Sequence, residues 1–180
     1  MADYKDSGVD IDAGERAVEL MKASIAKASR KEVIGGIGGF AGLFDATALT
    51  KFKQPLLATS TDGVGTKTEI ARRLGKYDTI GEDLVAMVVD DLVVCGAEPL
   101  FMTDYIAVGK VIPERIAEIV SGIARGCEKA NTALIGGETA EHPGLMADDE
   151  FDIAGAATGA VDADKLLSAD LVKAGDVLIG

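Results

Sequence analysis

The sequence predicts a fold of mixed helices and strands, for which the α+β and α/β classes both remain open. Two helical patterns recur at three- and four-residue spacing, over residues 13–30 and 113–130. Short apolar runs that suit buried strands alternate with the helical patterns, but several of them follow one another closely. At 180 residues the chain is long enough for one domain or for half of a larger enzyme.

The first third of the chain predicts a surface helix, a glycine-rich loop and a strand. Residues 13–30 place Ala17 and Met21 on a common apolar face, with charged residues at other positions. Residues 33–42 (VIGGIGGFAG) contain too much glycine for a stable helix or strand, so we expect a loop. After Pro55, the run LLATST suits a buried strand that ends at the motif TSTDGVGTK.

The remainder of the chain predicts three helices and three strands, followed by the start of a fourth strand. A proline at the first helical position and a continuous apolar face make 113–130 the clearest helix. The terminal GDVLIG predicts the beginning of a strand, so we expect the chain to be the front part of a longer protein. The other elements expected here are helices over 66–74 and 79–95 and the strands FMTDYIAVG, TALIGG and FDIAGAATGAVD.

The composition limits the partners of the chain. A net charge of −12 disfavours general nucleic-acid binding, which depends on basic patches. No apolar run approaches the ~20 residues of a membrane span, and the N-terminus lacks the pattern of a signal peptide. We therefore expect a cytoplasmic chain without a nucleic-acid or membrane partner. Cys95 and Cys127 lie far apart in apolar segments, which predicts buried free thiols.

The glycine-rich stretch from Gly35 to Gly39 has three interpretations. Residues 36–41, which begin in this stretch, fit the pattern G-x-G-x-x-A, with Asp62 about twenty residues further on, but no firm strand precedes the pattern as a dinucleotide-binding turn requires. A flexible loop without a ligand is the second interpretation. We favour the third, a loop whose backbone N–H groups close over phosphates.

The motif TSTDGVGTK (residues 59–67) combines glycines, a lysine and a carboxylate. It lacks the four-residue spacer of a Walker P-loop. Asp62 predicts a Mg²⁺ ion placed between the carboxylate and phosphate, because Mg²⁺ usually binds one or two carboxylates together with substrate phosphates. Lys67 would contact a phosphate, and the glycines would leave room for its approach. The alternative is a turn in which Asp62 bonds its own backbone.

The 79–95 segment is a strongly apolar helix that carries Asp83, Asp90 and Asp91. Apolar residues surround nearly its whole circumference, which predicts a buried helix. Asp83 and Asp90 share a face, because seven residues make about two turns. Burial of unpaired carboxylates costs several kcal/mol each, so we favour coordination to a metal or ligand. Pairing with distant arginines and an exposed acidic stripe are the alternatives.

The stretch ALIGGETAEHPG predicts a short strand followed by a loop that carries Glu138, Thr139 and Glu141. Loops at strand ends are where α/β proteins tend to place their sites, which suggests the edge of a site. His142, the single histidine, precedes a proline and is interpreted as a loop residue rather than a catalytic base.

Five segments together resemble the phosphoribosylformylglycinamidine cyclo-ligases, also called aminoimidazole ribonucleotide synthetases. In chain order they are YKDSGVDIDAG, EVIGGIGGFAGLFD, TDGVGTK, DLVAMVVDDLVVCGAEPLF and GGETAEHPG, and they span almost the whole chain. The resemblance implies an enzyme of purine biosynthesis that uses ATP and Mg²⁺ to phosphorylate the formyl oxygen of formylglycinamidine ribonucleotide. A nitrogen of the substrate then attacks, phosphate leaves, and the ring of aminoimidazole ribonucleotide closes.

The same resemblance implies a fold and a set of site residues. Residues 1–165 would form an α+β domain that binds ATP, with a mixed or antiparallel sheet covered by helices, and 166–180 would begin a second domain. The sheet would pair with that of a second subunit to form a barrel across a homodimer. Lys67 and Asp91 are implied as catalytic residues, and Asp62 and Asp91 as metal ligands. The residues implied to hold the nucleotide are Gly35, Gly36, Gly38, Gly39, Asp62, Gly63, Gly65, Thr66, Lys67, Asp83, Gly137 and Glu138.

The sequence departs from the family pattern at Asp90, where asparagine is common, and at His142, where methionine is common. Selenophosphate synthetases share the scaffold but carry cysteine or selenocysteine in the glycine-rich loop, whereas the first cysteine here is Cys95. Thiamine monophosphate kinases share the domain with different motifs. Because residues that grip the ribonucleotide in the family lie beyond Gly180, a dimerising nucleotide-binding module that is inactive alone is the second hypothesis.

Overall fold

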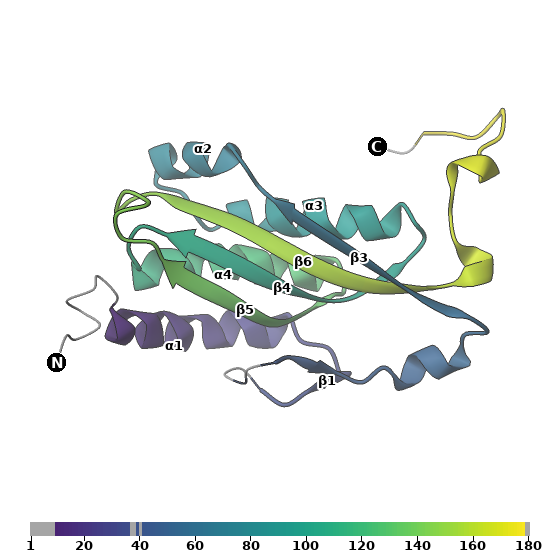
Figure 1. The fold of residues 1–180 in the computed structure, drawn as a ribbon, viewed down its shortest axis with the longest axis horizontal. Coiled ribbons are helices and arrows are strands. Elements are labelled where there is room, and N and C mark those ends of the chain that lie inside the picture. The colour runs from purple at the N-terminus through teal and green to yellow at the C-terminus, as the bar shows by residue number, and fades with distance from the viewer. Residues whose placement is uncertain (1–9, 37–38, 40, 179–180) are drawn as a thin grey trace.

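The structure is a computed structural model that describes residues 10–36, 39 and 41–178. Its main feature is a four-stranded mixed sheet in the order β3-β6-β4-β5, beside a two-stranded hairpin of β1 and β2 (Figure 1). β6 pairs antiparallel with both β3 and β4, and β5 runs parallel to β4. The strands are β1 (Val33–Ile34), β2 (Leu43–Phe44), β3 (Pro55–Gly63), β4 (Glu98–Val108), β5 (Ala133–Glu141) and β6 (Phe151–Asp162).

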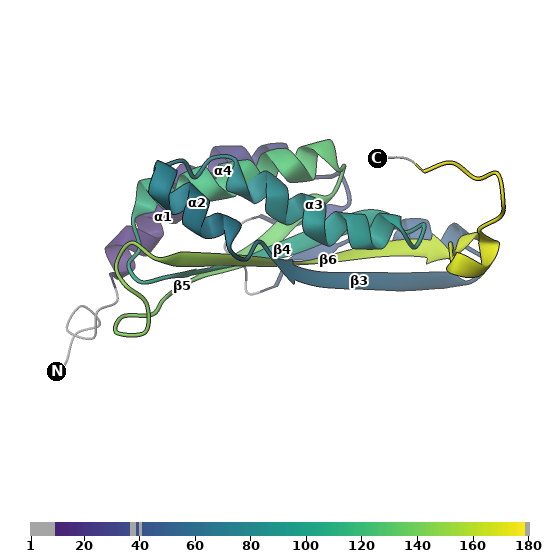
Figure 2. The same ribbon diagram turned by 90° about the horizontal axis from the view of Figure 1, so that it is seen from above.

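The four α-helices of the described residues cover one face of this sheet (Figure 2). In the part of the chain that the structure describes, no α-helix lies on the opposite face (Figure 2), and no helix is long and apolar enough to cross a membrane. The predicted α+β fold with a mixed sheet and helices is confirmed in this form. The helices are α1 (Ile11–Lys27), α2 (Lys67–Leu74), α3 (Ile80–Val93) and α4 (Pro113–Lys129), with 3-10 turns η2 (Thr47–Lys51), η3 (Ala163–Lys165) and η4 (Ala169–Leu171).

Local sequence signals explain where several helices begin and end. The Asp10 side chain caps α1 by accepting a hydrogen bond of 3.1 Å from the backbone N–H of Ala13. α4 begins at Pro113, whose missing N–H would have no partner at a helix start in any case. α2 ends at Leu74 and is capped by Gly75, which takes the left-handed conformation with φ of 60°.

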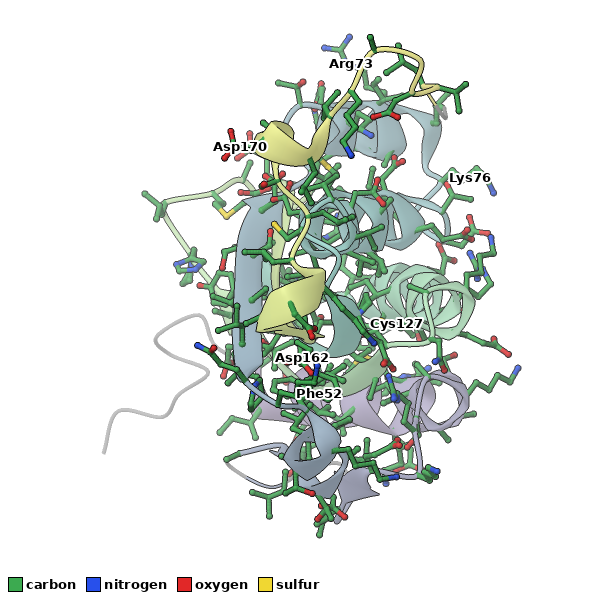
Figure 3. All side chains as sticks on the ribbon, turned by 90° about the vertical axis from the view of Figure 1, so that its right-hand side faces the viewer. Phe52, Arg73, Lys76, Cys127, Asp162 and Asp170 are labelled. Atoms are coloured by element: carbon green, nitrogen blue, oxygen red, sulfur yellow. The ribbon has the colours of Figure 1, made fainter. Side chains whose placement is uncertain are left out.

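The core lies between the sheet and helices α3 and α4. Small residues of β6 allow this close packing: a β-carbon at Gly155 would lie 2.9 Å from Met102 Cε and 3.5 Å from Leu84 Cδ2. Leu84 and Met102 are fully buried. Cys127 of α4 also lies in this interior (Figure 3), whereas Cys95 is only partly buried, and both thiols are free as predicted.

Four expectations about the elements were wrong in part. The loop expected over 33–42 begins with strand β1, which pairs Val33 with Phe44 across the hairpin. β3 and β5 are longer than expected, because both continue through their polar ends. The terminal segment is not a strand over its described residues 175–178. α3 is less buried than expected, since Asp90 and Asp91 on it are exposed.

Candidate functional site

The motif of residues 59–67 forms the end of β3 and the start of α2. β3 continues to Gly63, after which Gly65 adopts a left-handed φ of 68° and α2 begins at Lys67. A β-carbon at Gly63 would lie 3.3 Å from the carbonyl oxygen of Ile153, which is tighter than an ordinary contact. The neighbouring strand therefore leaves little room for a side chain at position 63, and the left-handed turn favours glycine at position 65. Thr66 lies between this turn and α2 and is exposed.

Asp62 lies half-buried on the helix-covered face of β3. Its Oδ1 accepts a hydrogen bond of 2.7 Å from the backbone N–H of Gly63, which is the local bond considered as the alternative to a metal ligand. Only this oxygen is engaged by a hydrogen bond within the described residues. The local bond therefore orients the carboxylate and leaves Oδ2 available to a ligand.

Helix α3 is buried on one side only, so the prediction of a helix buried around nearly its whole circumference was wrong. Asp90 and Asp91 are exposed, Asp83 is partly exposed, and Val94 just beyond the helix is 69% exposed. The reason is that α3 packs on the sheet and α4 with one face, and its outer face has no cover among the described residues. The cost of carboxylate burial therefore no longer argues for a metal here.

Two contacts join α3 to the motif. Ser60 of β3, which is buried, donates a hydrogen bond of 2.7 Å from Oγ to Asp91 Oδ2. Lys67 Nζ, at the start of α2, forms an ion pair of 3.2 Å with Asp83 Oδ2. The structure thus brings three carboxylates, Asp62, Asp83 and Asp91, together around the end of β3. These three and Lys67, which pairs with one of them, are called the carboxylate group below.

The donors in the carboxylate group fit Mg²⁺ chemically. Carboxylate oxygens are hard ligands, and Mg²⁺ usually keeps several waters and takes only one or two carboxylates along with phosphate oxygens. The described residues contain no group of three or more Asp, Glu, His or Cys side chains arranged to hold a metal. The arrangement therefore suits a metal that arrives with phosphates rather than a fully protein-ligated ion.

A second set of the expected residues lines a cavity of about 350 Å³ between α1, β5 and the glycine-rich segment. Gly36, Gly39, Gly137 and Glu138 all belong to its lining. Gly35, which begins this segment and directly precedes Gly36, has a left-handed φ of 91°. Gly38 lies outside the described residues.

Asp104 of β4 also lines this cavity, and sequence reasoning missed it. Burial raises the pKa of its carboxyl to about 7, and a hydrogen bond from its own backbone opposes the shift only in part. The carboxyl lies near Cys127, whose thiol has a pKa raised to about 12 by burial and, to a lesser degree, by the charge of Asp104. The available signal was its place in FMTDYIAVG. Met102, Asp104 and Ile106 stand at every second position there and therefore share one face of the strand, which is buried at Met102 and Ile106.

The two sets of residues are connected by one row across the sheet. Asp62 lies opposite Gly155 of β6, Gly155 lies opposite Asp104 of β4, and Asp104 lies beside Gly137 of β5. Residues in register on neighbouring strands point to the same face, and strands lie about 4.8 Å apart. Asp62 and Asp104 are therefore about 10 Å apart on the helix-covered face, and Gly137 lies about 5 Å beyond.

Comparison with known proteins now decides the family. Residues 44–161 match the family described as AIR synthase related protein, N-terminal domain. The chain belongs to this family. It is 57% identical over 177 residues to the phosphoribosylformylglycinamidine cyclo-ligase of Desulfitobacterium hafniense (strain DSM 10664 / DCB-2), an alignment that covers 98% of the chain and 52% of that relative. This member of the AIR synthase related family thus spans about half the length of the curated relatives that it matches.

Solved structures share the fold at low sequence identity. The structure of Escherichia coli HypE, a hydrogenase maturation protein, has a TM-score of 0.67 and 20% identity over 90% of this chain and 47% of its own. A HypE in complex with ATP has a TM-score of 0.61 and 19% identity, covering 90% of this chain and 44% of its own. These likenesses establish that the AIR synthase related domain has the fold of these proteins.

Proposed function

We propose that the chain is the nucleotide-binding part of an ATP-dependent cyclo-ligase that converts formylglycinamidine ribonucleotide to aminoimidazole ribonucleotide, with release of ADP and phosphate. The observation that carries the proposal is the carboxylate group, in a chain that is 57% identical to a cyclo-ligase over 98% of its length. The ATP complex of a HypE of the same fold supports a nucleotide ligand.

In this proposal the residues of the carboxylate group have different roles. Asp62 and Asp91 hold Mg²⁺, which supplies neutralising charge for the phosphates when it is bound. Lys67 contacts a phosphate oxygen, and its ion pair with Asp83 keeps the ammonium at the start of α2. Gly63, Gly65 and Thr66 offer backbone groups to the phosphates, and the glycine-rich segment closes over them with its backbone N–H groups, next to Glu138.

Loss of either proposed metal ligand is expected to weaken nucleotide binding. Asp62→Asn and Asp91→Asn should each reduce the Mg²⁺-dependent affinity for a non-hydrolysable ATP analogue by roughly tenfold or more, about 1.4 kcal/mol, because an amide oxygen carries no net charge. Isothermal titration calorimetry with and without Mg²⁺ measures this affinity.

The matched control is Asp90→Asn, which removes one exposed carboxylate of the same helix next to Asp91. It should leave the affinity within about twofold, since the hydrogen bond to Ser60 holds Asp91 and not Asp90 beside β3, and an exposed charge away from the site is largely screened. Metal-independent binding that is equal in all four proteins would contradict the proposed role of Asp62 and Asp91.

We also propose that the uncovered face of the sheet pairs with a second copy of the chain to form a homodimer. This face carries Leu57 and Tyr105, which are 68% and 41% exposed, together with threonines and alanines of β3, β4 and β6. Apolar side chains on a sheet face without cover indicate an interaction surface. Residues 1–165 would form this domain, and 166–180 would begin the next one.

The homodimer is tested by a charge on the uncovered face. Leu57→Lys is expected to convert the dimer to a monomer, because the ammonium would have to be desolvated in the interface. Sedimentation or light scattering at micromolar concentration measures the mass. The control is Leu74→Lys on α2, which is 72% exposed on the helix side and should stay dimeric. A monomeric parent chain, or equal behaviour of both variants, would rule out this interface.

The proposed setting of the enzyme is the cytoplasm, where ATP and small metabolites are present. Because the chain spans about half of the related cyclo-ligases, we propose that it binds nucleotide and dimerises but does not complete the turnover alone.

A further inference from the structure

The cavity between α1 and β5 has apolar walls and a carboxyl at its base. Its walls include Ala17, Val18 and Met21 of α1, Val120 of α4 and Leu134 of β5, and Asp104 lies among them. A volume of about 350 Å³ falls within the range of small-molecule sites, which are mostly apolar and hold a few placed polar groups. The cavity therefore has the composition of a binding site for a small, largely apolar molecule that carries a polar group.

The sheet makes room for the carboxyl of Asp104. A β-carbon at Gly137 would overlap Asp104 Oδ1, so any other residue at this position would displace the carboxyl. Gly155, on the opposite neighbour strand, also lacks a side chain. Gly137 thus leaves space for a carboxyl at a place where an apolar side chain would fill the interior more simply.

No cation of the described residues is paired with this carboxyl. Burial is the main influence on Asp104, and neither lysine nor arginine contributes to its ionisation. Among the described residues, the elements packed against Asp104 supply no cation either. The neighbouring groups are the Cys127 thiol of α4 and Gly137 of β5, and Glu138 of β5 lies further along the cavity lining. The lining residues from α1 and from the described part of the glycine-rich segment are not titratable. A positive partner must therefore come from outside these residues.

We propose that this cavity binds a planar amidine group, with Asp104 as its partner. A protonated amidine offers two N–H donors along one edge, which match the two oxygens of a carboxylate, and its flat shape suits apolar walls. Binding would leave Asp104 ionised, with its proton released to solvent, so that the charges of ligand and protein cancel. On the proposed function, the natural ligand would be the glycinamidine part of the substrate.

The proposal is tested with benzamidine, a flat aromatic amidine that stays protonated at neutral pH, and with benzamide, its uncharged analogue of equal shape. Calorimetry or NMR titration of the parent chain should show benzamidine binding roughly tenfold more tightly at about pH 8 than at about pH 6, because the carboxyl titrates between them. Benzamide should show no such change with pH. Asp104→Asn should lower the affinity for benzamidine at pH 8 by about tenfold or more.

The control variant is Asp152→Asn, which removes an exposed carboxylate of β6 and should bind benzamidine as the parent does. Equal affinities of the parent for benzamidine and benzamide at pH 8 would overturn the proposal, even if Asp104→Asn failed to fold. Retained benzamidine affinity in a folded Asp104→Asn would overturn it as well. Mg²⁺-dependent binding of the ATP analogue, measured on the same samples, shows separately whether the proposed nucleotide function stands.

Discussion

Replacement of Gly81 or Gly122 by alanine is expected to lower the free energy of unfolding by about 3 kcal/mol. The two glycines lie where α3 and α4 cross. A β-carbon at Gly81 would lie 2.6 Å from the carbonyl oxygen of Ile119, and one at Gly122 would lie 2.6 Å from that of Asp78. Because these neighbours are backbone atoms, the helices would have to move apart and open the core. Urea denaturation followed by circular dichroism measures the loss.

Gly14→Ala in α1 is the matched control, since a β-carbon there would meet no atom within 4 Å. Alanine has the higher helix propensity, so this variant should gain up to about 1 kcal/mol. The expected changes in the free energy of unfolding thus have opposite signs. This difference separates a steric effect from the general effect of replacing glycine in a helix. Parent-like stability in both Gly81→Ala and Gly122→Ala would show that α3 and α4 pack less closely than the structure indicates.

Much of the fold followed from hydrophobic periodicity. The helix expected over 113–130 corresponds to α4, and the strand FDIAGAATGAVD has the bounds of β6. The errors have physical causes. β3 and β5 continue through polar residues because backbone hydrogen bonds to the neighbouring strand, rather than side-chain polarity, decide where a strand ends. α3 looked buried because of valines such as Val93 and Val94, which are more than half exposed.

The site was harder to predict than the fold because its residues meet only through the sheet order. β6 comes last among the four strands in the chain but lies between β3 and β4, so it fixes the spacing of Asp62 and Asp104. No local pattern encodes that position. Ser60 and Asp104 were missed for a related reason. The role of a single polar residue in a strand depends on which residues of other helices and strands lie beside it, and the local sequence does not show them.

Ionisation of Asp104 is also expected to lower the free energy of unfolding as the pH rises. Asp104→Asn should abolish this contribution. The folded-state pKa of about 7 lies above the usual value, so the folded state binds the proton more tightly than the unfolded chain. The stabilisation from this proton is complete below about pH 4, is lost as the pH rises towards 7, and amounts to as much as about 4 kcal/mol. Residual solvent in the cavity reduces this value.

The comparison of the two proteins at two pH values isolates this effect. The free energy of unfolding of Asp104→Asn minus that of the parent should increase by about 2 kcal/mol between about pH 5 and pH 8, whatever the cost of the amide itself. Asp152→Asn, which is exposed, should track the parent at both values. A difference that stays constant with pH would mean that the Asp104 carboxyl is hydrated in the folded chain. In that case the cavity would be open to water, and a buried carboxyl would no longer explain why glycine occupies position 137.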